Sequence, residues 1–264
     1  MTWIAALPMY NVTPALADDW RALLADVLRA VASDACIVSQ SDDLPTLWRA
    51  PNLLLSQTCG YPLTHDLNDA DVQVVATPRF DVEGYEGARY SSAIVVHADA
   101  RYASIEALRN LRAAYNQDDS HSGMNALRHT VAPFADKGRF FSEAIRTGSH
   151  VGSLRAIAER RADVAAIDCV TMDYVREALP AVAREVRTLG YTRAAPGLPL
   201  IASRQVPAET IKALRAALEE AVQHDAARAT RLHLRGFSTL TLNDYDVITR
   251  MEDEARAAGY PRLA

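Results

Sequence analysis

The chain has 264 residues, of which 49% are hydrophobic and 23% are charged, and its net charge at pH 7 is −5. This composition is typical of a globular protein with room for one large domain or two smaller ones. Nucleic acid is not expected as a partner, because binding to a phosphate backbone needs clustered Lys and Arg, and this mildly acidic chain has no basic stripe.

The cysteines and apolar segments exclude further classes. Cys36, Cys59 and Cys169 form no CxxC pair, so no zinc site is expected, and their odd number argues against a full disulfide framework. No stretch approaches the roughly 18–20 apolar residues of a membrane span, so no membrane insertion is expected. The first ten residues lack the basic and long apolar parts of a signal peptide. We therefore expect a cytoplasmic protein, or a periplasmic one if an export signal has been removed.

Strands and helices alternate from the start of the chain. Residues 2–10 are a short apolar run typical of a buried strand. Thr13 and Pro14 then have the residue types of an N-cap and a first helical position, and apolar residues follow at helical spacing. Further buried strands are expected over 52–58 and 72–80. Such alternation predicts an α/β protein with a parallel sheet that helices cover on both faces.

The middle of the chain is a second run of α/β units. We expect strands over 90–99 and 112–116, a strand and turn over 140–149, and a buried strand that runs into a new helix over 163–175. Helices are expected over 104–110, with Ser104 as the cap, and over 123–135 and 150–162.

The last part of the chain has the clearest helix. Residues 184–192 and 198–203 are expected as strands, and 207–224 as a long amphipathic helix with Pro207 near its start. A final helix is expected over 242–260, with Gly259 as its stop.

Two extended segments, near 87–92 and near 187–192, bracket the middle block. Two extended crossings between α/β lobes are the expected form of a hinge. We therefore predict a first, discontinuous lobe of residues 1–88 and 191–264, and a second lobe of residues 89–190. Ligands often bind between domains and at the carboxyl ends of strands, so the ligand is expected in a cleft between the lobes.

The segment NQDDSHSGMNALR, residues 116–128, changes abruptly from polar residues to a helical pattern. Ser120 and Ser122 offer hydroxyls, His121 offers a further donor, and Gly123 lets a ligand approach the backbone closely. The helix that follows supplies free N–H groups and the positive end of its dipole, which together suit an anion. The alternative interpretation is simple capping of the helix by Ser122.

The segment LLLSQTCGYPL, residues 53–63, is a second candidate. Its apolar strand ends in Gln57, Thr58, Cys59, Gly60 and Tyr61, at the place where α/β proteins form ligand sites. The alternative is an ordinary turn between a strand and a helix. Cys59 as a nucleophile has no other support and is better interpreted as a packing residue.

Two further groups complete the candidates. Tyr10 closes the first strand and offers a hydroxyl. His150 lies at the start of a helix, and Asp168 ends an apolar strand, where it either caps the next helix or binds a donor.

Catalytic and metal sites are weaker interpretations. Ser120 or Ser122 with His150 and Asp168 has the residue types of a hydrolytic triad, but no G-x-S-x-G elbow surrounds either serine. A metal site from His121, His129 and His150 is not favoured, since His129 lies two helical turns from His121. No dinucleotide or P-loop motif is present, so no cofactor is expected.

Six motifs, taken in order, are similar to a known family. They are ALPMY (6–10), PNLLLSQTCGYPL (51–63), YSSAIVV (90–96), NQDDSHSGMNALR (116–128), TGSHVGSLRAIAERRADVAAIDCV (147–170) and PGLPLIAS (196–203). Over residues 1–240 the chain resembles the phosphate, phosphite and phosphonate substrate-binding proteins of ABC transporters. The resemblance implies a two-lobed type II periplasmic-binding-protein fold, with a mixed sheet flanked by helices in each lobe and two hinge crossovers.

The resemblance also implies a function and a site. It implies binding of a small oxyanion, as the solute-binding component of an ABC transporter with a permease as partner, or as a related sensor. The alternative is a cytoplasmic enzyme on the same fold, a hydrolase or transferase acting on a small anionic substrate. The expected ligand-binding residues are Tyr10, Gln57, Thr58, Cys59, Tyr61, Tyr90, Ser120, His121, Ser122, Gly123, Met124, His150 and Asp168.

Overall fold

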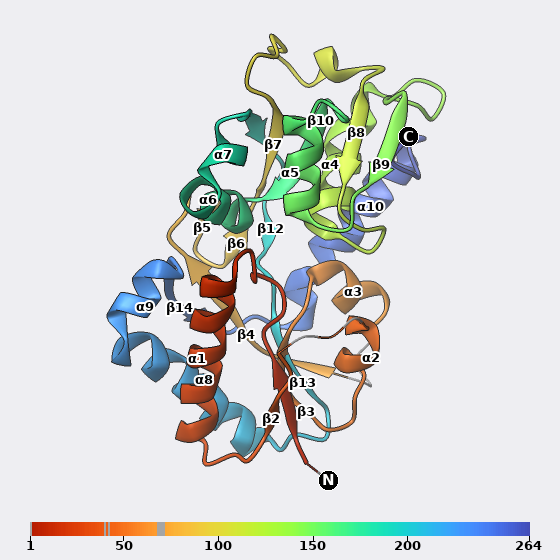
Figure 1. Ribbon diagram of the computed structural model, residues 1–264. Coiled ribbons are helices and arrows are strands. Elements are labelled where there is room, and N and C mark those ends of the chain that lie inside the picture. Colours follow the sequence, from red (N-terminus) through yellow and green to blue (C-terminus); the bar gives the residue numbers. More distant parts are fainter. Residues whose placement is uncertain (1, 40, 42, 68–71) are drawn as a thin grey trace. The chain divides into compact units, whose positions relative to one another are not determined.

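The computed structural model describes residues 2–39, 41, 43–67 and 72–264. The chain divides into two compact units. The first unit consists of Met1–Asp81, Glu86–Arg89 and Pro196–Tyr245, and the second of Val82–Tyr85, Tyr90–Ala195 and Asp246–Ala264. The colours of Figure 1 show that both units are built from segments far apart in the sequence.

The first unit contains a mixed sheet and helices on both of its faces. Its elements are β1 (Ile4–Ala6), α1 (Pro14–Ala30), β2 (Cys36–Ile37), α2 (Leu44–Trp48), β3 (Leu53–Gln57), α3 (Gly60–His65), β4 (Val72–Phe80), β13 (Leu200–Ser203), α8 (Ala208–His224), α9 (Ala226–Arg231), β14 (Leu234–Ser238) and the 3-10 turn η4 (Leu242–Tyr245).

The strand order of this sheet is β14-β4-β13-β3-β1-β2. Strands β1, β2 and β3 are parallel, as the alternation of elements predicts. Strand β13 lies between β3 and β4 and is antiparallel to both, so the sheet is mixed and not purely parallel. In Figure 1, α1 and α8 lie together on one face of the sheet, whereas α2 and α3 lie on the other.

The predicted start of α1 is confirmed. Thr13 is the N-cap and its hydroxyl accepts a hydrogen bond from the Leu16 N–H at 3.3 Å, while Pro14 occupies the first helical position. Both residues satisfy the needs of a helix start, since the cap pairs an orphan N–H and proline has no N–H to leave unpaired. The predicted long helix is likewise present as α8, and Ile211, Leu214 and Leu218 are buried along its apolar stripe.

The second unit has its own mixed sheet. Its elements are β7 (Ser92–His97), the 3-10 turn η1 (Glu106–Leu108), β8 (Arg112–Tyr115), the π-helical turn η2 (His121–Asn125), α4 (Ala126–Val131), the 3-10 turn η3 (Ala132–Phe134), β9 (Glu143–Arg146), α5 (His150–Ala158), β10 (Val164–Asp168), α6 (Cys169–Ala178), α7 (Pro180–Ala183), β11 (Val186–Tyr191) and α10 (Asp246–Ala257).

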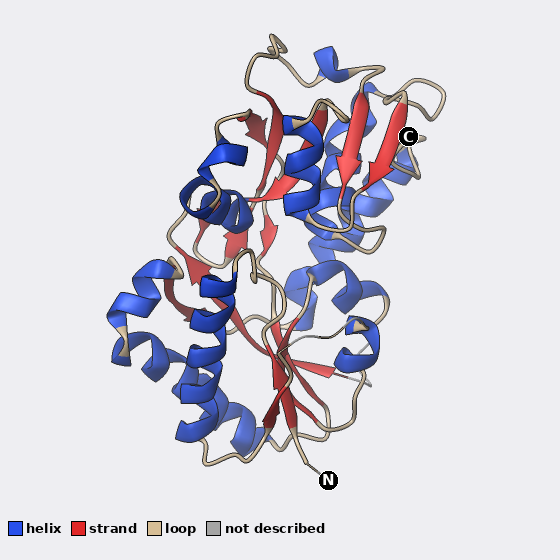
Figure 2. Cartoon of the chain, in the orientation of Figure 1, coloured by secondary structure: helices blue, strands red, loops and turns tan. Residues whose placement is uncertain are grey.

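The strand order of the second sheet is β11-β7-β10-β8-β9. Strands β8, β9 and β10 are parallel to one another, and β7 is antiparallel to β10 and β11. Helix α5 packs on one face of this sheet, and α4 with α10 covers the other (Figure 2). Because β8, β9 and β10 are parallel, their carboxyl ends meet at one edge, which is where ligand sites of α/β folds form.

The C-terminal helix α10 belongs to the second unit, whereas the sequence placed residues 191–264 in the first lobe. Helix α10 packs against α4, and a buried ion pair between Arg128 and Glu252 joins the two helices. Their nitrogen and oxygen atoms lie 3.3 Å apart, and each side chain is only 4% exposed. Unpairing a buried charge is costly, so this contact ties the end of the chain to α4.

The chain passes between the units near residues 81–90, at 195–196 and at 245–246. The sequence predicted two crossings, near 87–92 and near 187–192, and missed the one before α10. The short strands β5 (Tyr85–Glu86), β6 (Arg89–Tyr90) and β12 (Ala195–Pro196) lie at these passages and pair in the order β12-β6-β5.

Two predicted helices differ from the structure. The segment 104–110 contains only the 3-10 turn η1, and Ser104 does not cap it, since Ile105 occupies the cap position. Asn110 has a φ of 61°, in the left-handed region, so a helix does not continue through it. The helix predicted over 123–135 begins earlier, at His121, and its first turn is π-helical. No helix in the described part of the chain is long and apolar enough to cross a membrane.

Asp163 fixes the start of β10 to β8 and makes the second unit sensitive to acid. Its carboxylate accepts hydrogen bonds from the Arg112 N–H at 2.9 Å and from the Arg112 side chain at 2.9 and 3.0 Å. These hydrogen bonds hold the pKa of Asp163 below its usual range. A carboxyl with a lowered pKa stabilises the fold above its ordinary value, and this contribution is lost as the pH falls through the folded-state pKa.

We predict that Asp163→Asn lowers the free energy of unfolding by about 1–2 kcal/mol at neutral pH. The difference from the parent protein should shrink as the pH falls below the ordinary aspartate value of about 4 and then through the lower pKa of the folded carboxyl. Urea unfolding of both proteins at neutral pH and below about pH 4 measures this difference in the free energy of unfolding. Glu159→Gln, in an exposed pair with Arg161, is the matched control and should change little. An equal loss at both pH values would contradict this role.

Candidate functional site

The π-helical turn η2 stands at the carboxyl edge of the second sheet. Ser120 is its N-cap, and the Ser120 hydroxyl accepts a hydrogen bond from the Gly123 N–H at 3.1 Å. The Asn125 N–H donates to the Ser120 carbonyl at 3.0 Å, which makes the wide turn of a π-helix. Such turns occur often at functional sites. Capping by Ser122 was the alternative interpretation of the sequence, but Ser120 is the cap, and Ser122 lies inside the turn.

Because Ser122 is not the cap, its hydroxyl is used elsewhere. Ser122 Oγ and His150 Nε2 lie 2.8 Å apart and share a hydrogen bond. The Ser122 N–H lies before the first intrahelical hydrogen bond of the turn, as the first N–H groups of every helix do. Ser122 therefore brings both a backbone donor and a hydroxyl to the same place.

Gly123 is the point at which the polar groups converge. A Cβ atom at this position would lie 2.0 Å from Asn116 Oδ1 and 3.2 Å from His150 Cε1. No side chain fits there unless Asn116 moves, so the glycine is required by close approach. We call Asn116, Ser120, Ser122, Gly123 and His150 the polar cradle. Asn116 Oδ1 is buried and has no hydrogen-bond partner among the described residues.

The parallel strands of the second unit position the cradle. Asn116 follows β8, and His150 starts α5 after β9, so both lie at the shared carboxyl edge of these strands. Ser149 caps α5 by accepting a hydrogen bond from the Gly152 N–H at 3.0 Å, which fixes the start of the helix and hence His150. Sequence reasoning missed Asn116, although it opens the segment NQDDSHSG and directly follows a predicted strand.

His150 is neutral at physiological pH. Burial lowers the pKa of its imidazole to about 4, although the neighbouring Ala166 carbonyl acts in the opposite direction. Removal from water disfavours the charged form of the ring, which explains the direction of the shift. The imidazole therefore contributes hydrogen bonding to the cradle and no positive charge.

Asp168 caps the next helix. Its Oδ1 accepts hydrogen bonds from the Val170 N–H at 2.9 Å and the Thr171 N–H at 3.1 Å, so of the two interpretations of this carboxylate, capping of α6 is present in the structure. The side chain is almost fully buried, and these two donors account for its place at the end of an apolar strand.

Other predicted site residues surround η2. Tyr90 and His121 are both buried, and their rings lie edge to face with centroids 6.2 Å apart. Met124 is also buried. The Asn125 amide lies 3.1 Å from His121 Nδ1 and donates to the Ile248 carbonyl of α10, also at 3.1 Å. The turn is thus packed from several sides within the second unit.

The remaining predicted residues lie in the first unit. Gln57 ends β3, and its side chain is buried with neither Nε2 nor Oε1 hydrogen-bonded among the described residues. Thr58 and Cys59 follow it and are also buried, and Cys59 occupies the N-cap position of α3 without a side-chain cap. Tyr61 stacks on His65, with ring centroids 3.9 Å apart.

Tyr10 is part of an aromatic cluster in the first unit. Its ring centroid lies 6.2 Å from that of Trp20 and 5.4 Å from that of Phe80. Only 1% of Tyr10 is exposed, so its ring contributes to the packing of this unit.

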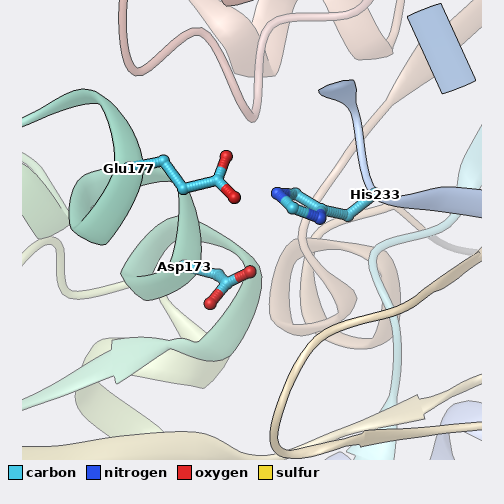
Figure 3. Close-up of side chains that lie close together, drawn as sticks. All are labelled: Asp173, Glu177 and His233. Atoms are coloured by element: carbon cyan, nitrogen blue, oxygen red, sulfur yellow. The ribbon is translucent and has the colours of Figure 1, made fainter. Parts of the chain in front are cut away.

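Figure 3 shows a further pair of acidic side chains in the second unit. Asp173 and Glu177 lie one helical turn apart on α6, and their carboxylates extend from it. Arg176 lies 3.6 Å from Asp173, so part of this charge is balanced locally. His233, which the figure also labels, belongs to the first unit.

Two units with mixed sheets flanked by helices, assembled from a discontinuous chain, define the fold of periplasmic binding proteins, and solved structures agree. The chain resembles the binding-protein component of an ABC phosphonate transporter from Pseudomonas aeruginosa, with a TM-score of 0.81 at 17% identity, over 97% of this chain and 87% of that one. PhnD1 from Prochlorococcus marinus, solved with methylphosphonate, gives a TM-score of 0.79 at 14% identity, over 97% and 98% of the two chains.

A histidine kinase sensor domain with similarity to periplasmic binding proteins also shares the fold. Its TM-score is 0.57 at 15% identity, over 88% of this chain and 96% of that one. A search of the curated proteins gave no match.

The family model for the periplasmic phosphonate substrate-binding proteins of ABC transporters matches residues 51–245. The chain belongs to this family. The fold class and the family predicted from the sequence are thereby confirmed, and so is the predicted class of function, a solute-binding protein.

The neutral state of His150 predicts a specific pH dependence of stability. An unfolded histidine binds a proton at about pH 6.5, whereas the folded one does so only near pH 4. Between these values the unfolded state binds more protons, so the free energy of unfolding contributed by this group rises with pH. We predict that His150→Gln has a flatter dependence than the parent protein in this window.

Urea unfolding at several pH values between about 4 and 6.5 measures this slope. His224→Gln, at the exposed end of α8, is the control and should keep the slope of the parent protein. A variant at position 150 with an unchanged or steeper slope would show that the imidazole is not held neutral.

Proposed function

We propose that this protein binds a small oxyanion of the phosphonate class at the polar cradle of the second unit. In this proposal it acts as the solute-binding component of an ABC transporter, with a permease as its partner. The binding is non-enzymatic.

The observation that carries the proposal is the convergence of uncharged polar groups on the start of η2. The Ser122 N–H lies at the positive end of a helix, and the Ser122 hydroxyl lies 2.8 Å from the neutral imidazole of His150. N–H groups and the dipole at a helix start favour an anion. The absence of a side chain on Gly123 lets Asn116 Oδ1 lie close to the backbone of the turn.

Family membership supports the ligand class and the partner. The matching family is described as the periplasmic substrate-binding protein of phosphonate ABC transporters. A structural relative from Prochlorococcus marinus was solved in complex with methylphosphonate. We propose the periplasm as the site of action, in line with the family and in place of the cytoplasm that the sequence favoured.

Several residues complete the proposal. In the second unit, Tyr90, His121 and Met124 would bound the cradle, since they pack around η2. In the first unit, the Gln57 amide is buried with no hydrogen-bond partner among the described residues, which is costly unless a ligand or water pairs it, so Gln57 stays a ligand-binding residue predicted from the sequence. Thr58, Cys59, Tyr61 and Tyr10 remain candidates from the sequence.

We predict that Ser122→Ala weakens binding of methylphosphonate by about 10- to 100-fold, which corresponds to about 1.4–2.8 kcal/mol. The variant loses the hydroxyl and leaves His150 Nε2 without its partner. Isothermal titration calorimetry measures the affinity, and circular dichroism checks the fold. Gly123→Val should have a larger effect, since its side chain would displace Asn116 Oδ1.

Ser142→Ala is the matched control, because Ser142 is an exposed serine of the second unit outside the cradle. Its affinity should equal that of the parent protein. Unchanged affinity in Ser122→Ala and Gly123→Val would remove the cradle as the binding site.

One observation favours the alternative of an enzyme. Ser122 and a neutral His150 lie within hydrogen-bond distance, as a nucleophile and its base do. The Asp168 Oδ1, however, is used to cap α6. A turnover assay on phosphate esters, with His150→Ala as the control, decides between the two. Turnover that disappears in the variant would replace the binding proposal by an enzyme, and no turnover would support binding.

A further inference from the structure

The cradle has an unusual balance of groups for a site that binds an anion. None of its five residues is a lysine or an arginine, and its one histidine is neutral at physiological pH. A doubly charged anion placed there would lose its hydration without gaining an opposite charge from the cradle. A singly charged anion pays a smaller penalty, and hydrogen bonds to neutral donors compensate for it more fully.

One cradle atom favours a hydrogen-bond donor on the ligand. Asn116 Oδ1 is a buried acceptor without a hydrogen-bond donor among the described residues. It lies 2.0 Å from the position that a Cβ of Gly123 would occupy, and His150 Cε1 lies 3.2 Å from the same point. An unpaired buried acceptor is costly, and a bare anionic oxygen beside it would add repulsion.

Both observations point to the same ligand feature. We propose that the cradle selects a singly protonated oxyanion, such as a hydrogen phosphonate, whose P–OH group donates a hydrogen bond to Asn116 Oδ1. This inference rests on the proposed function and specifies the protonation state that the site takes. Sulfate carries no proton at neutral pH. It would bind weakly because it has two charges and because it cannot donate a hydrogen bond to Asn116 Oδ1.

Ligands with and without a hydroxyl would be distinguished here as they are in other sites that form a hydrogen bond with a ligand hydroxyl. A ligand that lacks the hydroxyl leaves the acceptor unpaired, and the resulting penalty is large compared with that for a small change in shape. Asn116 would therefore determine specificity, while the N–H and hydroxyl of Ser122 would hold the anionic oxygens.

The elements of the second unit that carry or surround η2 hold other titratable and charged groups, and the test must separate their protonation from that of the ligand. By element, they are His121 on η2, Tyr90 on β6, Tyr115 on β8, Asp118 and Asp119 in the loop after β8, Arg146 on β9, Asp168 at the end of β10, Arg128 and His129 on α4, and Glu252 and Glu254 on α10. Burial and the neighbouring Asp118 raise the pKa of Tyr115, so its phenol stays protonated at neutral pH.

The experiment is calorimetric titration of the full chain with methylphosphonate between about pH 6 and about pH 9. We expect the affinity to be constant below the second pKa of the ligand and to fall about tenfold per pH unit above it. Chloromethylphosphonate, whose chlorine lowers its second pKa, should shift the break to lower pH by the same amount. A break set by a protein group would stay in place for both ligands.

Two isosteric ligands separate charge from the proton. Methanesulfonate carries one charge and no hydroxyl, and sulfate carries two charges and no hydroxyl. We expect methanesulfonate to bind at least about tenfold more weakly than methylphosphonate at low pH, as an unpaired buried acceptor would cause, and sulfate to bind more weakly still.

Asn116→Leu tests the residue itself. It should weaken methylphosphonate binding while leaving methanesulfonate binding unchanged or stronger, which a general loss of structure would not do. Gln117→Leu, which replaces the neighbouring amide of the same loop, is the matched control and should keep the preference of the parent protein. The pH profile of the unchanged protein supplies the test if the Asn116 variant does not fold.

The outcomes are distinguishable. No binding of methylphosphonate at any pH would overturn the proposed function and this inference with it. Binding whose affinity is independent of pH, or whose break does not follow the ligand, would overturn the inference alone. Equal affinity for methanesulfonate and methylphosphonate would do the same.

Discussion

The hydrogen bond from the Gly123 N–H to the Ser120 hydroxyl, 3.1 Å long, determines the geometry of the candidate site. It makes Ser120 the cap and starts the helix at His121, so Ser122 falls inside the first turn. From there the Ser122 hydroxyl reaches His150, and Gly123 faces Asn116 closely enough to exclude any side chain. A cap at Ser122 would start the helix two residues later and leave the hydroxyl paired with the backbone.

The surrounding unit keeps this turn in place through a buried polar network. The Asn125 amide connects the turn to α10, and Arg128 donates to Asn125 Oδ1 at 2.6 Å while pairing with Glu252. Such a network is stable only when its members are satisfied, and then it favours one arrangement. The C-terminal helix, which contributes no cradle residue, therefore supports the orientation of the donors.

The sequence predicted what local signals encode. Thr13 and Pro14 predicted the start of α1, and the spacing of apolar residues predicted the buried face of α8. It missed features that depend on contacts far apart in the chain. Arg128 and Glu252 meet only in the folded unit, so the C-terminal helix was placed in the wrong part of the protein. Asn116 is an ordinary loop residue until the fold brings its Oδ1 beside Gly123.

In the proposed complex, the backbone at the start of η2 donates a hydrogen bond to the oxyanion. Nuclear magnetic resonance of the ¹⁵N-labelled protein with methylphosphonate tests it most directly, because a hydrogen bond from N–H to a phosphonate oxygen gives a measurable coupling between nitrogen and phosphorus. We predict this coupling at the Ser122 amide, with a downfield shift of its proton. A saturated complex in which the Ser122 amide shows neither change, while amides elsewhere do, would contradict it.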